Sequence, residues 1–237
     1  MSNLILRGMN VKKYALAVVM VVLAAAGYSQ SSQAQTACAP TGTYANLEAA
    51  GACTIDDKIF GNFDFVAAAG TAITAADITY TVIVGAGFDG FRFNFGLTAT
   101  DGQNQDFTLE YAVQCISGNC IVSNELSITA GGSGGGVASV AEGYCLGALT
   151  VAGCPAGQSG SLFASSLGPA SDSATFPGVN EIALSKDINA SCSGLTSCVA
   201  TISVVTNTVD QTTPEPATLL LFGAGLAGLG LFRRRKA

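Results

Sequence analysis

Apolar and polar residues alternate along the central part of the chain with a period of two, which is the period of a half-buried β-strand. In the clearest stretch, Phe91, Phe93 and Phe95 alternate with polar residues. The strands expected from this pattern are 59–66, 78–84, 91–95, 107–113, 121–129 and 199–206. Clusters of Gly, Asn, Asp and Ser separate them, and no comparable stretch has a helical period. The pattern therefore predicts an all-β fold, an antiparallel β-sandwich of the jelly-roll type.

Two glycine-rich segments interrupt this pattern. Residues 143–174 are rich in Gly, Ser, Ala and Pro, and we expect a long loop held by Cys145 and Cys154. The sequence GGSGGG at 131–136 is typical either of a linker between two halves or of a loop within one sandwich. The stretch between the two ends of the chain, residues 35–213, is long enough for one well-buried β domain. We therefore favour a single exported domain.

The first residues have the pattern of a secretory signal peptide. Three basic residues precede an apolar stretch at 14–27, and a Ser-Gln-rich segment follows. Because Ser32 and Ala34 place small residues at the positions that signal peptidase reads, we expect this enzyme to cut after Ala34. The apolar stretch is short for a membrane span of about 20 residues. This favours a cleaved signal peptide, residues 1–34, over an uncleaved anchor.

The last residues have the pattern of a membrane helix followed by a basic cluster. The apolar run at 217–232 would form a helix of roughly 24 Å, slightly shorter than the hydrocarbon core of a bilayer. The basic cluster that follows consists of Arg233, Arg234, Arg235 and Lys236. Since basic residues remain on the cytoplasmic side, the rest of the protein is expected outside the inner membrane.

A Pro-Glu-Pro segment, Pro214, Glu215 and Pro216, precedes this helix. Each proline lacks a backbone N–H and favours extended geometry in the residue before it, so the segment cannot easily join the helix. We expect an extended, accessible peptide at the membrane face, as a processing enzyme requires. The GAGLAG sequence within the apolar run matches a dinucleotide fingerprint, but no strand–helix–strand unit surrounds it, which excludes a nucleotide loop.

Pro-Glu-Pro, an apolar Gly/Ala/Leu helix and a terminal arginine cluster, in this order, resemble the PEP-CTERM sorting signal of Gram-negative bacteria. The resemblance implies that residues 214–237 are recognised by an exosortase, with 214–216 as the recognition motif and 233–236 as the stop signal. It also implies removal of the tail near Pro-Glu-Pro and passage of residues 35–213 to the cell surface or the extracellular matrix. Proteins with such tails are commonly associated with exopolysaccharide, which is the expected partner. A plain single-span anchor is the alternative.

The charge of the exported region is strongly negative. Removal of both ends leaves three basic residues, Lys58, Arg92 and Lys186, against fifteen acidic residues, a net charge of −12. Because binding to nucleic acid or anionic lipid depends on basic residues that neutralise phosphates, neither is an expected partner.

All eight cysteines lie in the exported region, at Cys38, Cys53, Cys115, Cys120, Cys145, Cys154, Cys192 and Cys198. An even number of cysteines in an exported protein predicts disulfides. The spacing favours local closure of Cys115 with Cys120 and of Cys192 with Cys198, and it leaves the other pairings open. The chain has no histidine and no CxxC pair, so we expect neither a metal nor a cofactor.

Three motifs are typical of catalytic or cofactor sites but lack the necessary context. The G-x-G-x-x-G at 85–90 is followed by an alternating strand rather than a helix, so we expect a hairpin. Ser133 lies in a G-x-S-x-G sequence, but there is no histidine to act as its base. Two acidic pairs, Asp56 with Asp57 and Asp101 with Asp106, are candidates for a glycosidase site, although their spacing does not distinguish them from surface acids.

We therefore expect a non-enzymatic structural protein of the cell surface or matrix. The first alternative is a carbohydrate-binding adhesin, in which Tyr44, Tyr80, Tyr111 or Tyr144 would stack on sugar rings. The second is a secreted hydrolase, which requires two carboxylates about 5–10 Å apart in a cleft.

Overall fold

A computed structural model describes residues 36–147 and 154–211 of the chain. The predicted cleavage site at Ala34, the Pro-Glu-Pro segment at 214–216 and the basic cluster at 233–236 lie outside these residues, as does the predicted membrane helix. Within the two described ranges, no helix combines the length and the hydropathy needed to cross a membrane.

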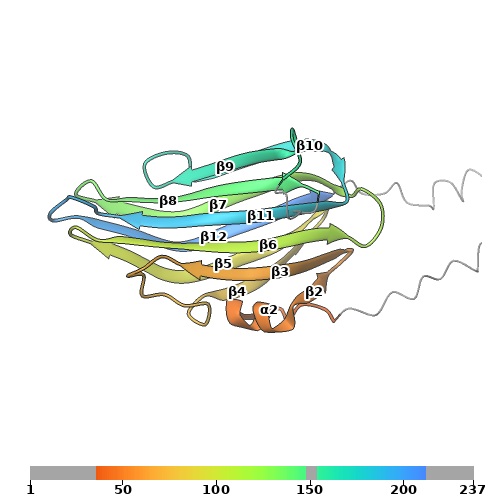
Figure 1. Cartoon of the computed structure of the whole chain (residues 1–237), viewed down its shortest axis with the longest axis horizontal. Coiled ribbons are helices and arrows are strands. Elements are labelled where there is room, and N and C mark those ends of the chain that lie inside the picture. The colour runs from red at the N-terminus through yellow and green to blue at the C-terminus, as the bar shows by residue number, and fades with distance from the viewer. Residues whose placement is uncertain (1–35, 148–153, 212–237) are drawn as a thin grey trace, which may run out of the picture. The chain divides into compact units, whose positions relative to one another are not determined.

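Twelve described strands form two antiparallel sheets of six strands each (Figure 1). Sheet A has the order β2-β3-β6-β11-β8-β9 and sheet B has the order β1-β4-β5-β12-β7-β10. The strands of sheet A are β2 (Ala52–Ile55), β3 (Lys58–Ala67), β6 (Asn104–Cys115), β11 (Glu181–Ser191), β8 (Val137–Leu146) and β9 (Ser159–Ser165). The strands of sheet B are β1 (Thr41–Thr43), β4 (Thr79–Gly85), β5 (Phe88–Thr100), β12 (Val199–Gln211), β7 (Ile121–Ser133) and β10 (Ser171–Val179).

The last eight strands have the pairing of a jelly roll. Strand β5 pairs with β12, β6 with β11, β7 with β10 and β8 with β9, so the chain folds back on itself as one long hairpin of strands. Successive members of this hairpin lie in opposite sheets, except at its β8–β9 end. The predicted antiparallel sandwich of the jelly-roll type is therefore confirmed.

The core lies between the sheets, where the alternating strands place their apolar residues. Phe91 and Phe93 of β5 and Phe107 of β6 are buried, as the two-residue period requires. Phe60 meets Phe91 edge to face, with ring centroids 5.1 Å apart. Val84 continues the alternation of β4 but is exposed, because it lies where the β4–β5 hairpin turns.

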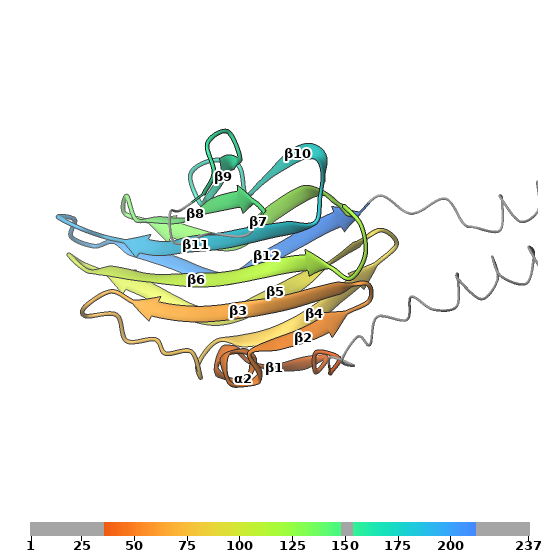
Figure 2. The same ribbon diagram turned by 45° about the vertical axis from the view of Figure 1, so that its right-hand side comes forward.

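Residues 143–174, expected as one long loop, contain the end of β8, all of β9 and the start of β10. This prediction is wrong because β9 has only two buried apolar side chains, Leu162 and Ala164, and the apolar Phe163 between them is exposed, which breaks the alternation. Figure 2 shows β9 and β10 at one edge of the sandwich and β1, β2 and the short helix α2 at the other.

The sequence pattern also missed this helix, α2 (Tyr44–Ala50). Seven residues are too few to establish a 3.6-residue period. The Thr43 N–H donates to Asn46 Oδ1 at 2.9 Å at the start of the helix, and Gly51 ends it with a φ of 72°.

The two central glycine motifs lie in turns. Residues 85–90 form the β4–β5 hairpin with Gly87 at a φ of 95°, which confirms the expected hairpin. Ser133 ends β7, and Gly134 and Gly135 have the positive φ of the turn into β8. The GGSGGG segment is thus a connection within the jelly roll.

All eight cysteines form disulfides, as predicted. The pairs are Cys38–Cys53, Cys115–Cys120, Cys145–Cys154 and Cys192–Cys198. Each pair joins cysteines that are near one another in the sequence, and the two expected local closures are among them.

Candidate functional site

A groove of about 450 Å³ lies on the outer face of sheet A. Its floor comes from β6, β8 and β11, and its rims include residues of β3 and β9. The strand period explains this position, because Ala112 and Ala183 alternate with the buried Tyr111 and Leu184 and therefore face away from the core.

The floor of the groove consists of residues with small side chains. Ala112 lies opposite Ala183, and Gly143 lies opposite Ser185, so four neighbouring positions on three strands carry short side chains or none. The Cys145–Cys154 disulfide also lines the groove. A hollow forms because taller residues surround this patch of small ones.

The groove is lined by acidic and neutral polar groups. The Ser185 hydroxyl donates to Glu110 Oε1 at 2.9 Å, and Glu181 lies four residues before Ser185 on β11. That spacing corresponds to roughly 13 Å along the strand. Asn62 contributes a neutral amide, and no lysine or arginine of the described residues lines the groove. The arrangement accepts hydrogen bonds from hydroxyl or amine groups and repels anions.

Asp187 and Asp106 form a carboxyl pair on the same face of sheet A. Asp106 lies on β6 and Asp187 on β11, two residues beyond Ser185. Partial burial, together with the hydrogen bond and the charge of Asp106, raises the pKa of Asp187 to about 6. The raised pKa favours the protonated form of Asp187 beside Asp106, whereas the two catalytic carboxylates of a glycosidase are separated.

The predicted tyrosine platform is absent from the described surface. Tyr44, Tyr80 and Tyr111 are buried in the core. Tyr144 is partly exposed, and its ring packs against Phe176 with the centroids 6.0 Å apart. These side chains therefore do not form a row on which a sugar chain could stack.

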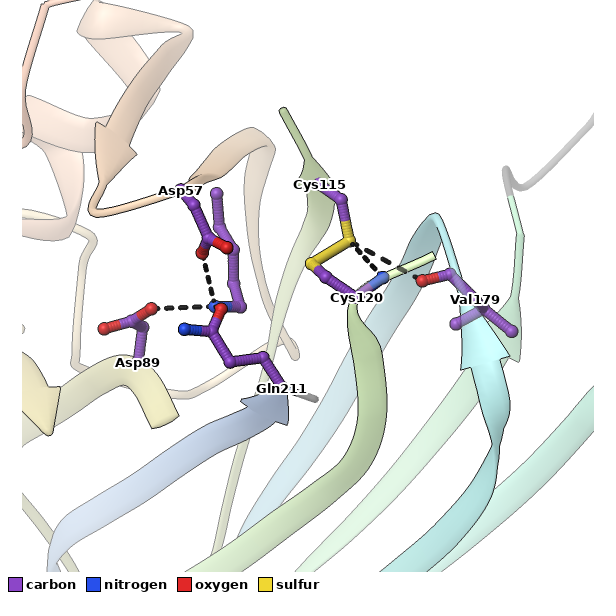
Figure 3. Close-up of a disulfide and its surroundings, with 7 residues drawn as sticks. Asp57, Asp89, Cys115, Cys120, Val179 and Gln211 are labelled. Carbon is purple, nitrogen blue, oxygen red and sulfur yellow. Dashed lines mark hydrogen bonds and ion pairs between the residues drawn. A yellow bond between two sulfur atoms is a disulfide. The ribbon is translucent and has the colours of Figure 1, made fainter. Parts of the chain in front are cut away.

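The predicted pair Asp56 and Asp57 lies in a cluster around a buried lysine. Asp57 and Asp89 each accept a hydrogen bond of 2.8 Å from Lys58 Nζ, and Gln211 Oε1 accepts a third. The three acceptors converge near the Cys115–Cys120 disulfide (Figure 3).

The carboxylate oxygens of Asp56, Asp57 and Asp89 come within 4.8 Å of one another, a spacing that could hold a metal ion. The Lys58 ammonium already supplies the counter-charge for two of them. Burial raises the pKa of Asp89, and the hydrogen bond from Lys58 opposes that rise. The cluster thus has the character of a structural ion pair.

The second predicted acidic pair does not form a site. Asp101 Oδ1 accepts a 2.7 Å hydrogen bond from the Cys198 N–H, which fixes the turn closed by the Cys192–Cys198 disulfide. Asp106 instead belongs to the pair with Asp187.

Sequence reasoning missed a group of buried polar residues between the sheets. Lys186, Glu142, Asn124 and Asn207 are all buried. The sequence contains one indication of this group. Lys186 follows Ile182 and Leu184 at intervals of two residues, so its side chain lies on the same face of the strand as theirs.

Residues 212–236 match the family described as the PEP-CTERM protein-sorting motif. The chain therefore carries the sorting signal that the Pro-Glu-Pro segment and the basic cluster indicated. The match covers only the tail of the chain, so it concerns the destination of the protein rather than the activity of the sandwich. No curated protein matches the chain.

Two solved structures resemble the chain weakly. One is TmCBM61 in complex with β-1,4-galactotriose, with a TM-score of 0.29 and 10% identity over 62% of this chain and 87% of that one. The other is the enzymatically active domain of bacteriophage CBA120 tailspike protein 4, with a TM-score of 0.26 and 13% identity. That alignment covers 64% of this chain and 19% of the tailspike chain. These scores are too low to assign a function to the groove.

Proposed function

We propose that this chain, which its PEP-CTERM motif marks as an exported and exosortase-processed surface protein, is a non-catalytic structural component of the cell surface or extracellular matrix. The observation that carries the proposal is the set of four disulfides, which leaves no described cysteine free. Such a framework suits a protein that must persist in an oxidising environment outside the cell.

The disulfides stabilise the connections of the sandwich. Cys115–Cys120 closes the crossover from β6 to β7, and Cys192–Cys198 closes the crossover from β11 to β12. Cys38–Cys53 fastens the segment before β1 to β2. On the chain-entropy model, loops of these lengths contribute about 2–3 kcal/mol each. Two of the four disulfides therefore hold the jelly roll at points where its strands change sheets.

A second candidate function is the binding of carbohydrate in the groove. The specific observation in its favour is the hollow itself, in which Glu110, Ser185 and Asn62 offer polar groups around a floor of small residues. Hydroxyl-rich sugars match such acceptors, and the carboxylates disfavour acidic sugars. The expected ligand is therefore a neutral or amine-bearing segment of the matrix polysaccharide.

One experiment separates the two functions. A host strain lacking the gene is complemented with wild type, with Ala183→Leu, which fills the groove, or with Thr81→Leu on the exposed face of β4 as a matched control. Matrix cohesion restored by all three proteins supports the structural function. Failure of Ala183→Leu alone assigns the function to the groove, and release of reducing sugars from the polysaccharide by the purified protein contradicts the non-catalytic assignment.

The sorting step has its own test. Replacement of Pro214, Glu215 and Pro216 by alanine is expected to leave the full tail on the protein and the protein in the membrane. Intact-mass analysis of the wild type and the variant from the host measures this directly. Equal release of both proteins from the membrane contradicts exosortase processing at this motif.

A further inference from the structure

A charged pair lies in the middle of the core, on the inner face of sheet A. Lys186 of β11 lies directly opposite Glu142 of β8, with Lys186 Nζ 3.0 Å from Glu142 Oε2 and both side chains 0% exposed. The same ammonium lies 4.3 Å from the centroid of the Tyr111 ring on β6. Three strands of sheet A thus surround one buried amine.

Two asparagines of sheet B complete the cluster. Asn207 of β12 donates through Nδ2 to Glu142 Oε2 at 3.2 Å and to Asn124 Oδ1 at 2.8 Å. Its Oδ1 accepts a hydrogen bond from the Tyr111 hydroxyl. Asn124 of β7 donates to the other oxygen of Glu142. Lys186 and Asn207 therefore share the same oxygen of Glu142 from opposite sheets.

The lysine is the poorly satisfied member of this cluster. Its Nζ is one of two buried side-chain polar atoms in the described residues without a hydrogen bond of good geometry. A buried ammonium with a single carboxylate neighbour is costly. Burial lowers the pKa of Lys186, and the Glu142 carboxylate opposes that change. The neutral amine that results from proton loss is a nucleophile.

We propose that Lys186 and Asn207 form an intramolecular amide bond between their side chains, with Glu142 as proton carrier and Tyr111 as hydrogen-bond donor to the reacting carbonyl. The bond joins β11 of sheet A to β12 of sheet B across the core.

The step needs no oxidant or cofactor. Glu142 takes a proton from the Lys186 ammonium, and the free electron pair of Nζ attacks Cγ of Asn207. Negative charge develops on Oδ1, where the Tyr111 hydroxyl stabilises it. Glu142 passes the proton to Nδ2, the Cγ–Nδ2 bond breaks, and a second proton follows the same route from Nζ. One amide forms and the side-chain nitrogen of Asn207 leaves as an ammonium ion, so atoms and charge balance.

The hydrogen bonds favour Asn207 over Asn124 as the acceptor. The Asn207 carbonyl is polarised by a hydroxyl, whereas Asn124 Oδ1 accepts only from the Asn207 amide. Burial raises the pKa of Tyr111 well above its usual value, so its hydroxyl remains protonated as a donor. Asn207 Nδ2 also contacts Glu142 Oε2, the oxygen that lies next to Lys186 Nζ, whereas Asn124 donates to the other oxygen of the carboxylate.

The wild-type protein gives the decisive test without any variant. Mature protein from the host is reduced, denatured and digested with trypsin, which cleaves after a lysine only when its amine is free. We expect no cleavage after Lys186 and a peptide containing Lys186 and Asn207 that is lighter by one ammonia. Cleavage after Lys186 with an unmodified Asn207 overturns the proposal, and a link from Lys186 to Asn124 overturns the assignment of the acceptor.

A pair of variants tests the proton carrier. Glu142→Gln retains the side-chain shape but cannot carry the proton, so the bond should form about 10²–10⁴-fold more slowly. Glu125→Gln, a matched change on an exposed side chain of β7, should leave the bond complete. Full linkage in a Glu142→Gln protein contradicts the role of Glu142, and the four native disulfides in each variant verify that both proteins fold.

Discussion

The structure buries two lysines completely, and it treats them differently. Lys58 Nζ donates to Asp57, Asp89 and Gln211, so three acceptors satisfy its three N–H groups. Lys186 Nζ has one carboxylate and one aromatic face, and no hydrogen bond of good geometry. Burial alone therefore does not mark a lysine as part of a reactive site. The satisfied Lys58 ammonium belongs to a structural ion pair, whereas Lys186 shares its Glu142 oxygen with the Asn207 carboxamide, the arrangement from which we infer the amide bond.

The positions of the two lysines in the fold explain this difference. Lys58 begins β3, where the neighbouring turn supplies Asp57, whose side chain is 39% exposed, and the end of β12 supplies Gln211. Lys186 lies in the middle of β11, between two sheets whose backbone groups are already paired. The groups that contact it there are the Glu142 carboxylate of β8 and the Tyr111 ring of β6, and both of these side chains are hydrogen-bonded to Asn207 of the opposite sheet.

Loss of the Lys58 ammonium should give the largest change in stability. Lys58→Met leaves Asp89, which is 0% exposed, without its counter-charge, so we expect the free energy of unfolding to fall by about 3–5 kcal/mol. Urea denaturation with the disulfides intact measures this. Asp57→Asn at the exposed end of the same cluster should cost less than about 1 kcal/mol. Equal costs for the two changes would mean that the cluster is not organised around a buried charge.

Removal of the Tyr111 hydroxyl should affect only the Lys186 cluster. Tyr111→Phe leaves the Asn207 carbonyl without its donor, so we expect a loss of about 1–3 kcal/mol in the free energy of unfolding. The same change should leave a fraction of the chains without the Lys186–Asn207 bond. Peptide mapping measures the linked fraction, and complete linkage in Tyr111→Phe would show that the hydroxyl takes no part in the reaction.

The smallest expected effect on stability comes from Asp187, which lies partly exposed on the surface, unlike the two buried lysines. Its folded pKa of about 6 exceeds the usual 3.8, so the folded state binds this proton more tightly than the unfolded state. The stabilisation from Asp187 is therefore complete below pH 3.8 and is lost as the pH rises through about 6.

Asp187→Asn should remove this pH dependence and stabilise the protein at pH 7 by up to about 1 kcal/mol. Melting temperatures of wild type and variant across this range measure the effect. Identical pH profiles for the two proteins would contradict the raised pKa of Asp187.

The sequence pattern predicted the strands in which apolar and polar residues alternate clearly, because this alternation shows which side chains are buried. Phe91 and Phe93 alternate with polar residues strongly enough to identify β5, and the short cysteine spacings identified two disulfides. The sorting motif of the tail could also be predicted from the sequence, because its Pro-Glu-Pro, apolar and basic segments follow one another directly. Strand β9 was not predicted because its adjacent residues Leu162 and Phe163 are both apolar although only Leu162 is buried, and most of its other residues are Ser or Gly.

The Lys186 cluster and the groove could not be predicted from the sequence, because pairing between strands that are distant in the sequence brings their residues together. Glu142 and Lys186 meet through the β8–β11 register, and Asn207 reaches them from the other sheet. The groove likewise exists only once Ala112 and Ala183 lie opposite one another. No local pattern encodes these neighbours, although a lysine in an apolar register position marks one member of the cluster.

The two lysines also provide the most direct test of the proposed Lys186–Asn207 bond. They are the only lysines in residues 35–213, so the mature protein carries one proposed free amine and one proposed linked amine. Host-derived protein is reduced, denatured and treated with an amine-acylating reagent, and the labelled positions are identified by mass spectrometry. We expect full acylation of Lys58 and none of Lys186. Equal acylation of both side chains would contradict the Lys186–Asn207 bond.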